Sequence, residues 1–126
     1  MIDARELIIG NKIASGVEFK ETSIIGTVLE IGNLEREFEQ IYCECEESFE
    51  WFFKDNYCGI PLTEEWLIRF GLERKNGYPY KYLDGYIKIR NGQYFFKYYQ
   101  LEIELPYVHT FQNLAYALTG TELTLK

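Results

Sequence analysis

The dipeptide Asn91-Gly92 is the strongest constraint on how this chain folds. Asn-Gly is the preferred loop of a two-residue β-hairpin, because both residues tolerate the positive φ angles of such a turn. With this loop, Arg90 faces Gln93, and every residue of 86–90 gains a fixed antiparallel partner. One face of the hairpin is then apolar and belongs to the core: Ile87, Ile89, Tyr94 and Phe96. The other face mixes rings with cations and is a candidate binding surface: Tyr86, Lys88, Arg90, Phe95 and Lys97.

A short helix is expected before this hairpin, from Glu64 to Phe70. Thr63 is a favourable N-cap, because its hydroxyl can accept a hydrogen bond from the first turn. Gly71 suits the left-handed position that ends a helix. We expect the face that carries Trp66, Leu67 and Phe70 to be buried.

A second helix is expected between Pro106 and Gly120, after a strand that contains Leu101, Ile103 and Leu105. Helical spacing predicts one buried apolar stripe: Val108, Phe111, Leu114, Ala115 and Leu118. The stripe opposite the core is a second candidate binding surface: His109, Gln112, Asn113 and Tyr116. Residues 122–125 are expected to add a final strand.

The residues before Pro61 favour short strands. The run from Ser23 to Ile31 is rich in β-branched residues, and Gly26 is a position that suits a bulge. The segment from Leu34 to Phe53 is ambiguous, because some apolar residues recur at helical steps while Ile41, Cys43 and Cys45 alternate as in a strand. Two strands with a turn at 46–48 are favoured, because of the resemblance described next.

Two long motifs, Ile60-Pro-Leu-Thr-Glu-Glu-Trp-Leu-Ile-Arg-Phe-Gly-Leu72 and Tyr107-Val-His-Thr-Phe-Gln-Asn-Leu-Ala-Tyr-Ala-Leu-Thr-Gly120, carry a resemblance. Together with the opening Glu6-Leu-Ile-Ile-Gly-Asn11, they resemble a family of small uncharacterised proteins of gut bacteria, their prophages and their phages. The resemblance implies an N-terminal SH3-like small β-barrel and a C-terminal half that contains helices, with strands leading into the Pro-Leu-Thr helix. It supplies no catalytic residues, and the acidic run from Glu30 to Glu50 is a departure from it.

The predicted fold class is therefore α+β, with an SH3-like small β-barrel, then a short helix, an antiparallel hairpin or meander, and a C-terminal helix. A length of 126 residues fits one compact domain over 1–126, with a β half at 1–60 and an α+β half at 61–126. The sequence holds no apolar run of the roughly 18 residues that span a membrane, and Met1 to Ile13 lacks the continuous apolar region of a secretory signal. The expected location is cytoplasmic, without membrane association.

Charge is polarised along the sequence. Eight glutamates and one arginine lie between Glu30 and Glu50, so this segment carries the whole net charge of −7. The segment from Arg74 to Lys97 is basic instead. Such polarity is compatible with two ordinary solvated faces or with a charged docking surface. The candidate acidic docking surface consists of Glu37, Glu39, Glu44 and Glu46.

Residues with the chemistry of a metal or catalytic site are few: Cys43, Cys45, Cys58 and His109. Only one residue separates Cys43 from Cys45, whereas paired zinc ligands usually stand two to four apart. No motif marks a nucleophile, and three cysteines without a secretory signal do not indicate a disulfide framework. We therefore expect core or solvated roles for these residues, with no metal, no cofactor and no catalytic residue.

The favoured function is a non-enzymatic protein-interaction module, in a phage or prophage context an accessory protein acting on a host protein. The second interpretation is a nucleic-acid-binding small barrel that stacks bases on the Tyr, Lys and Arg residues of the hairpin, although a charge of −7 opposes approach to phosphates. An enzyme is the third. The expected partner is a host protein or a second copy of this chain.

Overall fold

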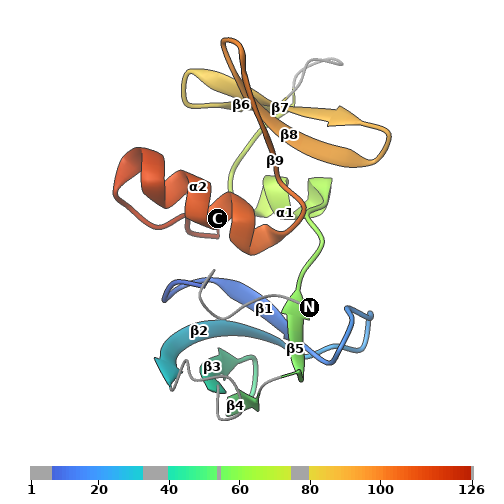
Figure 1. The fold of residues 1–126 in the computed structure, drawn as a ribbon, viewed down its shortest axis with the longest axis vertical. Helices are drawn as coiled ribbons and strands as arrows, with labels where there is room; N and C mark the ends of the chain where they lie inside the picture. The colour runs from blue at the N-terminus through green and yellow to red at the C-terminus, as the bar shows by residue number, and fades with distance from the viewer. Residues whose placement is uncertain (1–6, 33–39, 54, 75–79, 126) are drawn as a thin grey trace.

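The computed structural model describes residues 7–32, 40–53, 55–74 and 80–125. They form an α+β fold of two antiparallel sheets and two helices (Figure 1). In chain order the elements are β1 (Lys12–Ser15), β2 (Ile25–Gly32), β3 (Gln40–Cys45), β4 (Phe49–Phe53), β5 (Tyr57–Gly59), α1 (Glu64–Arg69), β6 (Tyr80–Tyr82), β7 (Gly85–Arg90), β8 (Gln93–Tyr98), β9 (Leu101–Glu104) and α2 (Val108–Thr119).

The N-terminal sheet has the strand order β4-β3-β2-β1-β5. Its strands β3 and β4, joined by a turn at 46–48, confirm the two-strand interpretation of this segment over the helical one. The sheet is open: among the described residues β5 pairs only with β1, and no ladder joins it to β4. A closed barrel is absent from this part of the chain, so the SH3-like expectation is not confirmed.

The irregularity in β2 lies at a different residue from the one expected. The register of β2 and β3 shifts between Val28 and Glu30, and not at Gly26. A Cβ at Gly26 would stand 2.7 Å from the Cβ of Cys43. The glycine therefore allows two strands to approach closely, which is the second common reason for a glycine inside a strand.

Helix α1 begins at the predicted Glu64 and ends at Arg69, one residue before the predicted Phe70, which is its C-cap. The Oγ1 of Thr63 accepts a hydrogen bond from the backbone N–H of Trp66, at 3.5 Å. Gly71 has a φ of 94°, and the N–H of Leu72 donates to the carbonyl of Leu67 at 3.0 Å, which is the bond that closes a left-handed C-terminal cap. The predicted burial of Trp66, Leu67 and Phe70 is confirmed.

The C-terminal sheet is the meander β6-β7-β8-β9, and its central hairpin has the predicted register, from Arg90 with Gln93 to Tyr86 with Lys97. Both loop residues, Asn91 and Gly92, have positive φ angles.

Helix α2 also begins and ends as expected, and its C-cap is Gly120. Two predictions about this end of the chain are wrong. The side chain of Leu118 is 52% exposed, because it lies in the last turn of α2, beyond the buried residues Phe111 and Ala115. Residues 121–125 form no strand, and Leu123 packs as a single side chain against the core.

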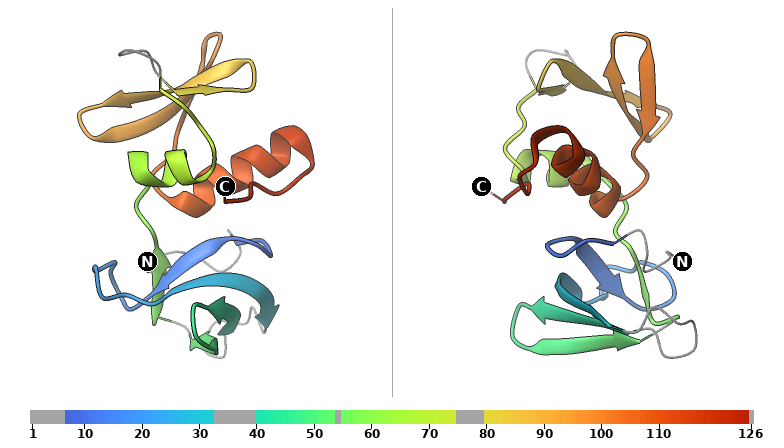
Figure 2. Two further views of the ribbon diagram at one scale, coloured as in Figure 1. Left: turned by 180° about the vertical axis from the view of Figure 1, so that it is seen from behind. Right: turned by 60° about the vertical axis from the view of Figure 1, so that its left-hand side comes forward.

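The two helices lie between the two sheets in every view (Figure 2). This arrangement produces two apolar cores. The first lies inside the N-terminal sheet: Leu7, Ile13, Val28, Ile41, Cys43, Phe52 and Tyr57. The second lies among the helices and the C-terminal sheet: Ala14, Cys58, Ile60, Leu62, Trp66, Leu67, Phe70, Leu72, Tyr80, Ile87, Phe96, Leu105, Val108 and Phe111.

Strands β1 and β5 connect the two cores. Successive side chains of a strand point to opposite faces. Ile13 and Tyr57 accordingly enter the first core, while their neighbours Ala14 and Cys58 enter the second. Among the described residues, no helix is long and apolar enough to cross a membrane.

Candidate functional site: an aromatic and acidic face on the N-terminal sheet

Strand β4 presents three aromatic side chains to solvent. Phe49, Trp51 and Phe53 alternate along the strand, so they share one face, while Phe52 points into the first core. Their exposed fractions are 60%, 39% and 55%. Large apolar side chains gathered on one exposed face are typical of an interaction surface.

Strand β3 extends this surface. Tyr42 pairs with Trp51, and Glu44 pairs with Phe49. The Tyr42 ring lies 4.8 Å from the Trp51 ring and 6.0 Å from the Phe49 ring, between centroids. We call the set Tyr42, Glu44, Phe49, Trp51 and Phe53 the aromatic–acidic face. The rings of Tyr42, Phe49 and Trp51 form a connected platform rather than isolated exposed residues.

The charges around this face are carboxylates. Glu44 belongs to the face, and Glu30 of β2 pairs with Tyr42 and so lies beside it. Glu46 and Glu47 are exposed in the turn that enters β4, and Glu50 is exposed on the strand itself. Of the predicted acidic docking surface, the structure brings Glu44 and Glu46 to this face. Glu37 and Glu39 lie outside the described residues.

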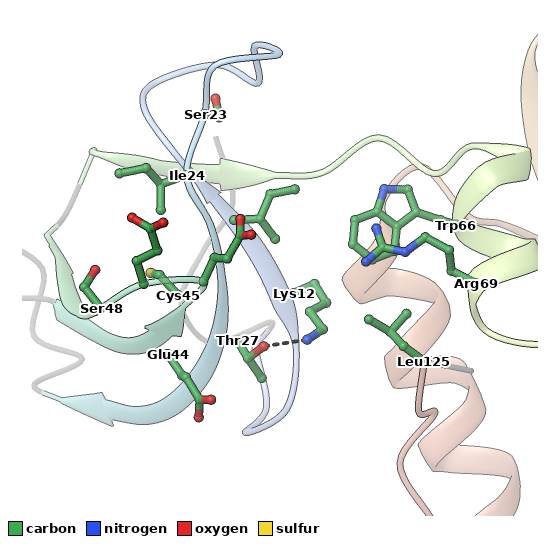
Figure 3. A pocket seen from close by; sticks show the side chains of 13 residues that line it. Lys12, Ser23, Ile24, Thr27, Glu44, Cys45, Ser48, Trp66, Arg69 and Leu125 are labelled. Carbon is green, nitrogen blue, oxygen red and sulfur yellow. Dashed lines mark hydrogen bonds between the residues drawn. The ribbon is translucent and has the colours of Figure 1, made fainter.

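A cleft of about 780 Å³ adjoins the face at Glu44 (Figure 3). One wall comes from the N-terminal sheet and the turn at 46–48, and the other from Trp66 and Arg69 of α1. Lys12 lies on the sheet side, and its Nζ donates to the Oγ1 of Thr27 at 2.6 Å. Burial and then the nearby charge of Arg69 lower the pKa of Lys12, while Glu44 acts in the opposite direction. The cleft thus carries both signs of charge.

The basic face of the hairpin is largely occupied by contacts within the chain. The guanidinium of Arg90 lies 4.7 Å from the centroid of the Phe95 ring, and Phe95 is buried. Arg90 also forms an ion pair with Glu102 at 3.1 Å, and Lys97 approaches the same carboxylate at 3.9 Å. The prediction of Phe95 as an accessible binding residue is therefore wrong, because β9 and Arg90 cover that side chain. Tyr86 is exposed and Lys88 is half-buried.

The predicted polar stripe of α2 does not face solvent as a unit. His109 and Gln112 are 1% and 5% exposed. The side chain of Gln112 accepts from the N–H of Lys12 at 2.8 Å and donates to the carbonyl of Gly10 at 3.0 Å. Asn113 accepts from the side chain of Asn11 at 2.9 Å.

The stripe was expected to be a surface, but it packs on β1 and joins the two halves of the chain. Only Tyr116, which is 47% exposed, keeps the predicted accessibility.

The thiols are reduced and differ in exposure. Cys43 and Cys58 are buried, and Cys45 is half-buried. Burial, with a smaller contribution from Cys45, raises the pKa of Cys43 to about 12. Burial also raises the pKa of Cys45 and of Cys58. A thiol with a raised pKa is protonated at neutral pH and is a weak nucleophile. Within the described ranges, no three His, Cys, Asp or Glu side chains converge as a metal site.

Phe49, Trp51 and Phe53 are not among the binding residues predicted from the sequence. The alternation of these residues with Glu50 and Phe52 was the available signal. It indicates a strand, but both faces of that strand carry aromatic residues. Alternation therefore does not show which face packs into the core.

A comparison of the chain with protein-family models, with curated proteins and with solved structures found no match.

Proposed function

We propose that this chain is a non-enzymatic interaction module whose aromatic–acidic face binds a basic segment of another protein. The observation that carries the proposal is the exposure of Phe49, Trp51 and Phe53 side by side on one strand. Exposed aromatic residues that become buried on binding contribute most of the affinity in many interfaces. A phage or prophage accessory protein acting on a host protein is the context that the sequence motifs favour.

The charges around the face support a basic partner. Glu30, Glu44, Glu46 and Glu47 surround or enter the ring platform, so an approaching cationic segment is attracted from a distance. A Lys or Arg side chain can also lie over an exposed ring, which adds roughly 0.5–1 kcal/mol for each such contact. The carboxylates also repel an acidic partner and the phosphates of nucleic acid.

We also propose that the N-terminal half is an SH3-like small barrel. Strand β1 pairs with both β2 and β5, and the meander from β1 to β4 curls around one core. The proposal concerns the strand order and the curl of the sheet, and it leaves the outer edge of β4 unpaired among the described residues.

The test uses two synthetic peptides of equal length, one alternating lysine with threonine and the other alternating glutamate with threonine. Fluorescence anisotropy should show that the lysine peptide binds and the glutamate peptide does not. Trp51→Ala should weaken binding by about tenfold or more, as loss of a central aromatic contact does. Glu44→Lys should slow association, with a larger effect at low salt.

Leu101→Ala is the matched control, because Leu101 is 54% exposed on β9 of the other sheet. Its affinity for the lysine peptide should equal that of the wild type. The proposal fails if the lysine peptide does not bind, or if Trp51→Ala and Leu101→Ala behave alike.

Nucleic-acid binding by the hairpin is the competing interpretation, and the ion pairs of Glu102 with Arg90 and Lys97 count against it. Micromolar binding of a single-stranded oligonucleotide that is lost on replacing Lys88, Arg90 and Lys97 with alanine would favour nucleic-acid binding over binding of a basic protein segment.

A further inference from the structure

The hydrogen-bond pattern of β3 and β4 determines where the backbone of β4 points. The N–H of Cys45 donates to the carbonyl of Ser48 at 2.7 Å, so these two residues form a hydrogen-bonded pair. Hydrogen-bonded and non-hydrogen-bonded pairs alternate along an antiparallel ladder. Glu44 with Phe49 and Tyr42 with Trp51 are therefore non-hydrogen-bonded pairs.

In a non-hydrogen-bonded pair, both backbone groups of a residue point away from the partner strand. The N–H and C=O of Phe49 and of Trp51 thus point to the outer edge of β4. Glu50 and Phe52 direct theirs to β3. The two residues that expose aromatic side chains also present backbone donors and acceptors along the edge.

This edge is open within the described part of the chain, where β4 is the terminal strand of its sheet. Edge strands are usually protected by proline, by lysine or by a bulge. The sequence of β4, Phe-Glu-Trp-Phe-Phe, contains neither residue, and its register with β3 is regular. Phe49 and Trp51 are accordingly placed to accept a further strand.

The carboxylates near β4 determine the charge of the segment that can pair with its outer edge. Each copy carries exposed Glu44, Glu46 and Glu47 near this edge, so pairing of two copies through β4 would bring two acidic surfaces towards each other, and surfaces of like charge repel. A segment with lysine or arginine at every second position has the opposite charge. Alternate side chains of an added strand lie on one face, so these cations would lie over the rings of the aromatic–acidic face.

We propose that the partner segment binds as a sixth strand along the outer edge of β4, with cationic side chains on the face that carries Trp51. This inference rests on the proposed function, since it names the way in which the basic segment is held. Strand addition of this kind takes its affinity from main-chain hydrogen bonds and its specificity from alternate side chains.

The experiment is amide hydrogen exchange, followed by NMR on the full chain with and without the alternating lysine–threonine peptide. Bound peptide should slow exchange at the N–H of Phe49 and of Trp51 by at least about tenfold, because those groups become hydrogen-bonded. The N–H groups of Glu50 and Phe52 are the internal control, and their exchange should not change beyond that of the rest of the sheet.

Peptide binding without slower exchange at Phe49 and Trp51 would overturn strand addition and leave the proposed function standing. Absence of peptide binding would overturn the proposed function itself. Strong protection of Phe49 and Trp51 in the free protein would show the edge to be occupied already. Protection that depends on protein concentration would assign it to a second copy, and protection independent of concentration would assign it to another part of this chain. Either result also overturns strand addition by a partner.

Discussion

Two large apolar residues occupy left-handed backbone positions at hairpin turns. Leu83, between β6 and β7, has a φ of 52°, and Tyr99, between β8 and β9, has a φ of 54°. A residue with a Cβ in this region is less stable by roughly 1–2 kcal/mol, while glycine is free of that penalty. Tyr99 is 83% exposed, so little burial offsets its strain.

We predict that Tyr99→Gly stabilises the protein. Relief of strain outweighs the roughly 0.5–1 kcal/mol that glycine loses in chain entropy, so the midpoint of thermal unfolding should rise by about 2–5 °C. Gln100→Gly is the control, because Gln100 is outside the set of positive-φ residues, and it should lower the midpoint. A lower midpoint for Tyr99→Gly would show that contact with the Tyr98 ring, 4.6 Å away, outweighs the strain.

Cys43 links stability to pH. The pKa of its thiol is about 12 in the folded chain, raised first by burial, against 9.0 as the ordinary value. Between these two values the unfolded chain ionises the thiol and the folded chain does not. The folded state then binds more protons, so its stability falls as pH rises.

We predict that the free energy of unfolding of the wild type falls from pH 9 to pH 12 more steeply than that of Cys43→Val, by up to about 1.4 kcal/mol per pH unit. Urea unfolding at a series of pH values measures the difference, and the other titrating groups cancel in it. Equal slopes for the two proteins would mean that the thiol ionises in the folded state. Below pH 9 the difference in stability should be constant.

At the scale of elements, both sides of helix α2 contact other parts of the fold, whereas an amphipathic surface helix buries only one side. Its apolar side packs on the second core through Phe111, and its polar side reaches β1 through Gln112. A helix with both sides in contact is held between two layers. The buried amide of Gln112 accepts from the N–H of Lys12 and donates to the carbonyl of Gly10, so it satisfies one donor and one acceptor of the backbone.

We predict that Gln112→Leu destabilises the protein by about 2–4 kcal/mol, because it leaves the N–H of Lys12 and the carbonyl of Gly10 without this partner in a partly buried place. Denaturant unfolding followed by circular dichroism measures the change. Tyr116→Ala, one turn further along the same stripe, should cost less than about 1 kcal/mol, since that side chain is 47% exposed. Similar effects of the two substitutions would argue against burial of Gln112.

At the scale of the whole molecule, two cores share β1 and β5 as a common wall. Ile13 and Ala14 are neighbours in sequence, and each is completely buried in a different core. Loss of one core therefore removes the support of the strands that line the other. This coupling supports the expectation of one cooperative domain over both halves.

We predict a single unfolding transition. Trp51 reports on the N-terminal sheet and Trp66 on the second core. In Trp51→Phe and in Trp66→Phe, the fluorescence midpoint of the remaining tryptophan should coincide with the circular dichroism midpoint of the same variant, as two-state unfolding requires. Separate midpoints within one variant would show that the halves unfold independently.

The features determined by the sequence itself depend on residues close together in the chain. The Asn91-Gly92 turn, its register and the caps at Thr63, Gly71 and Gly120 were predicted and are present. Each depends on φ preferences or on a hydrogen bond within a few residues. Alternation likewise supported two strands between 40 and 53, once the family resemblance favoured them over a helix.

Tertiary structure alone decided which surfaces are accessible. Gln112 looks solvated in a helical projection, but β1, about 100 residues earlier in the chain, covers it. His109 looks solvated too, but it is 1% exposed and stacks on the Tyr107 ring. Phe95 is covered by Arg90 and by β9, while Phe49 and Trp51 stay exposed because no described part of the chain packs over their face of β4. Periodicity gives the two faces of an element, whereas burial depends on which distant element packs against each face. The candidate site is defined by such an absence of packing, and no local pattern records it.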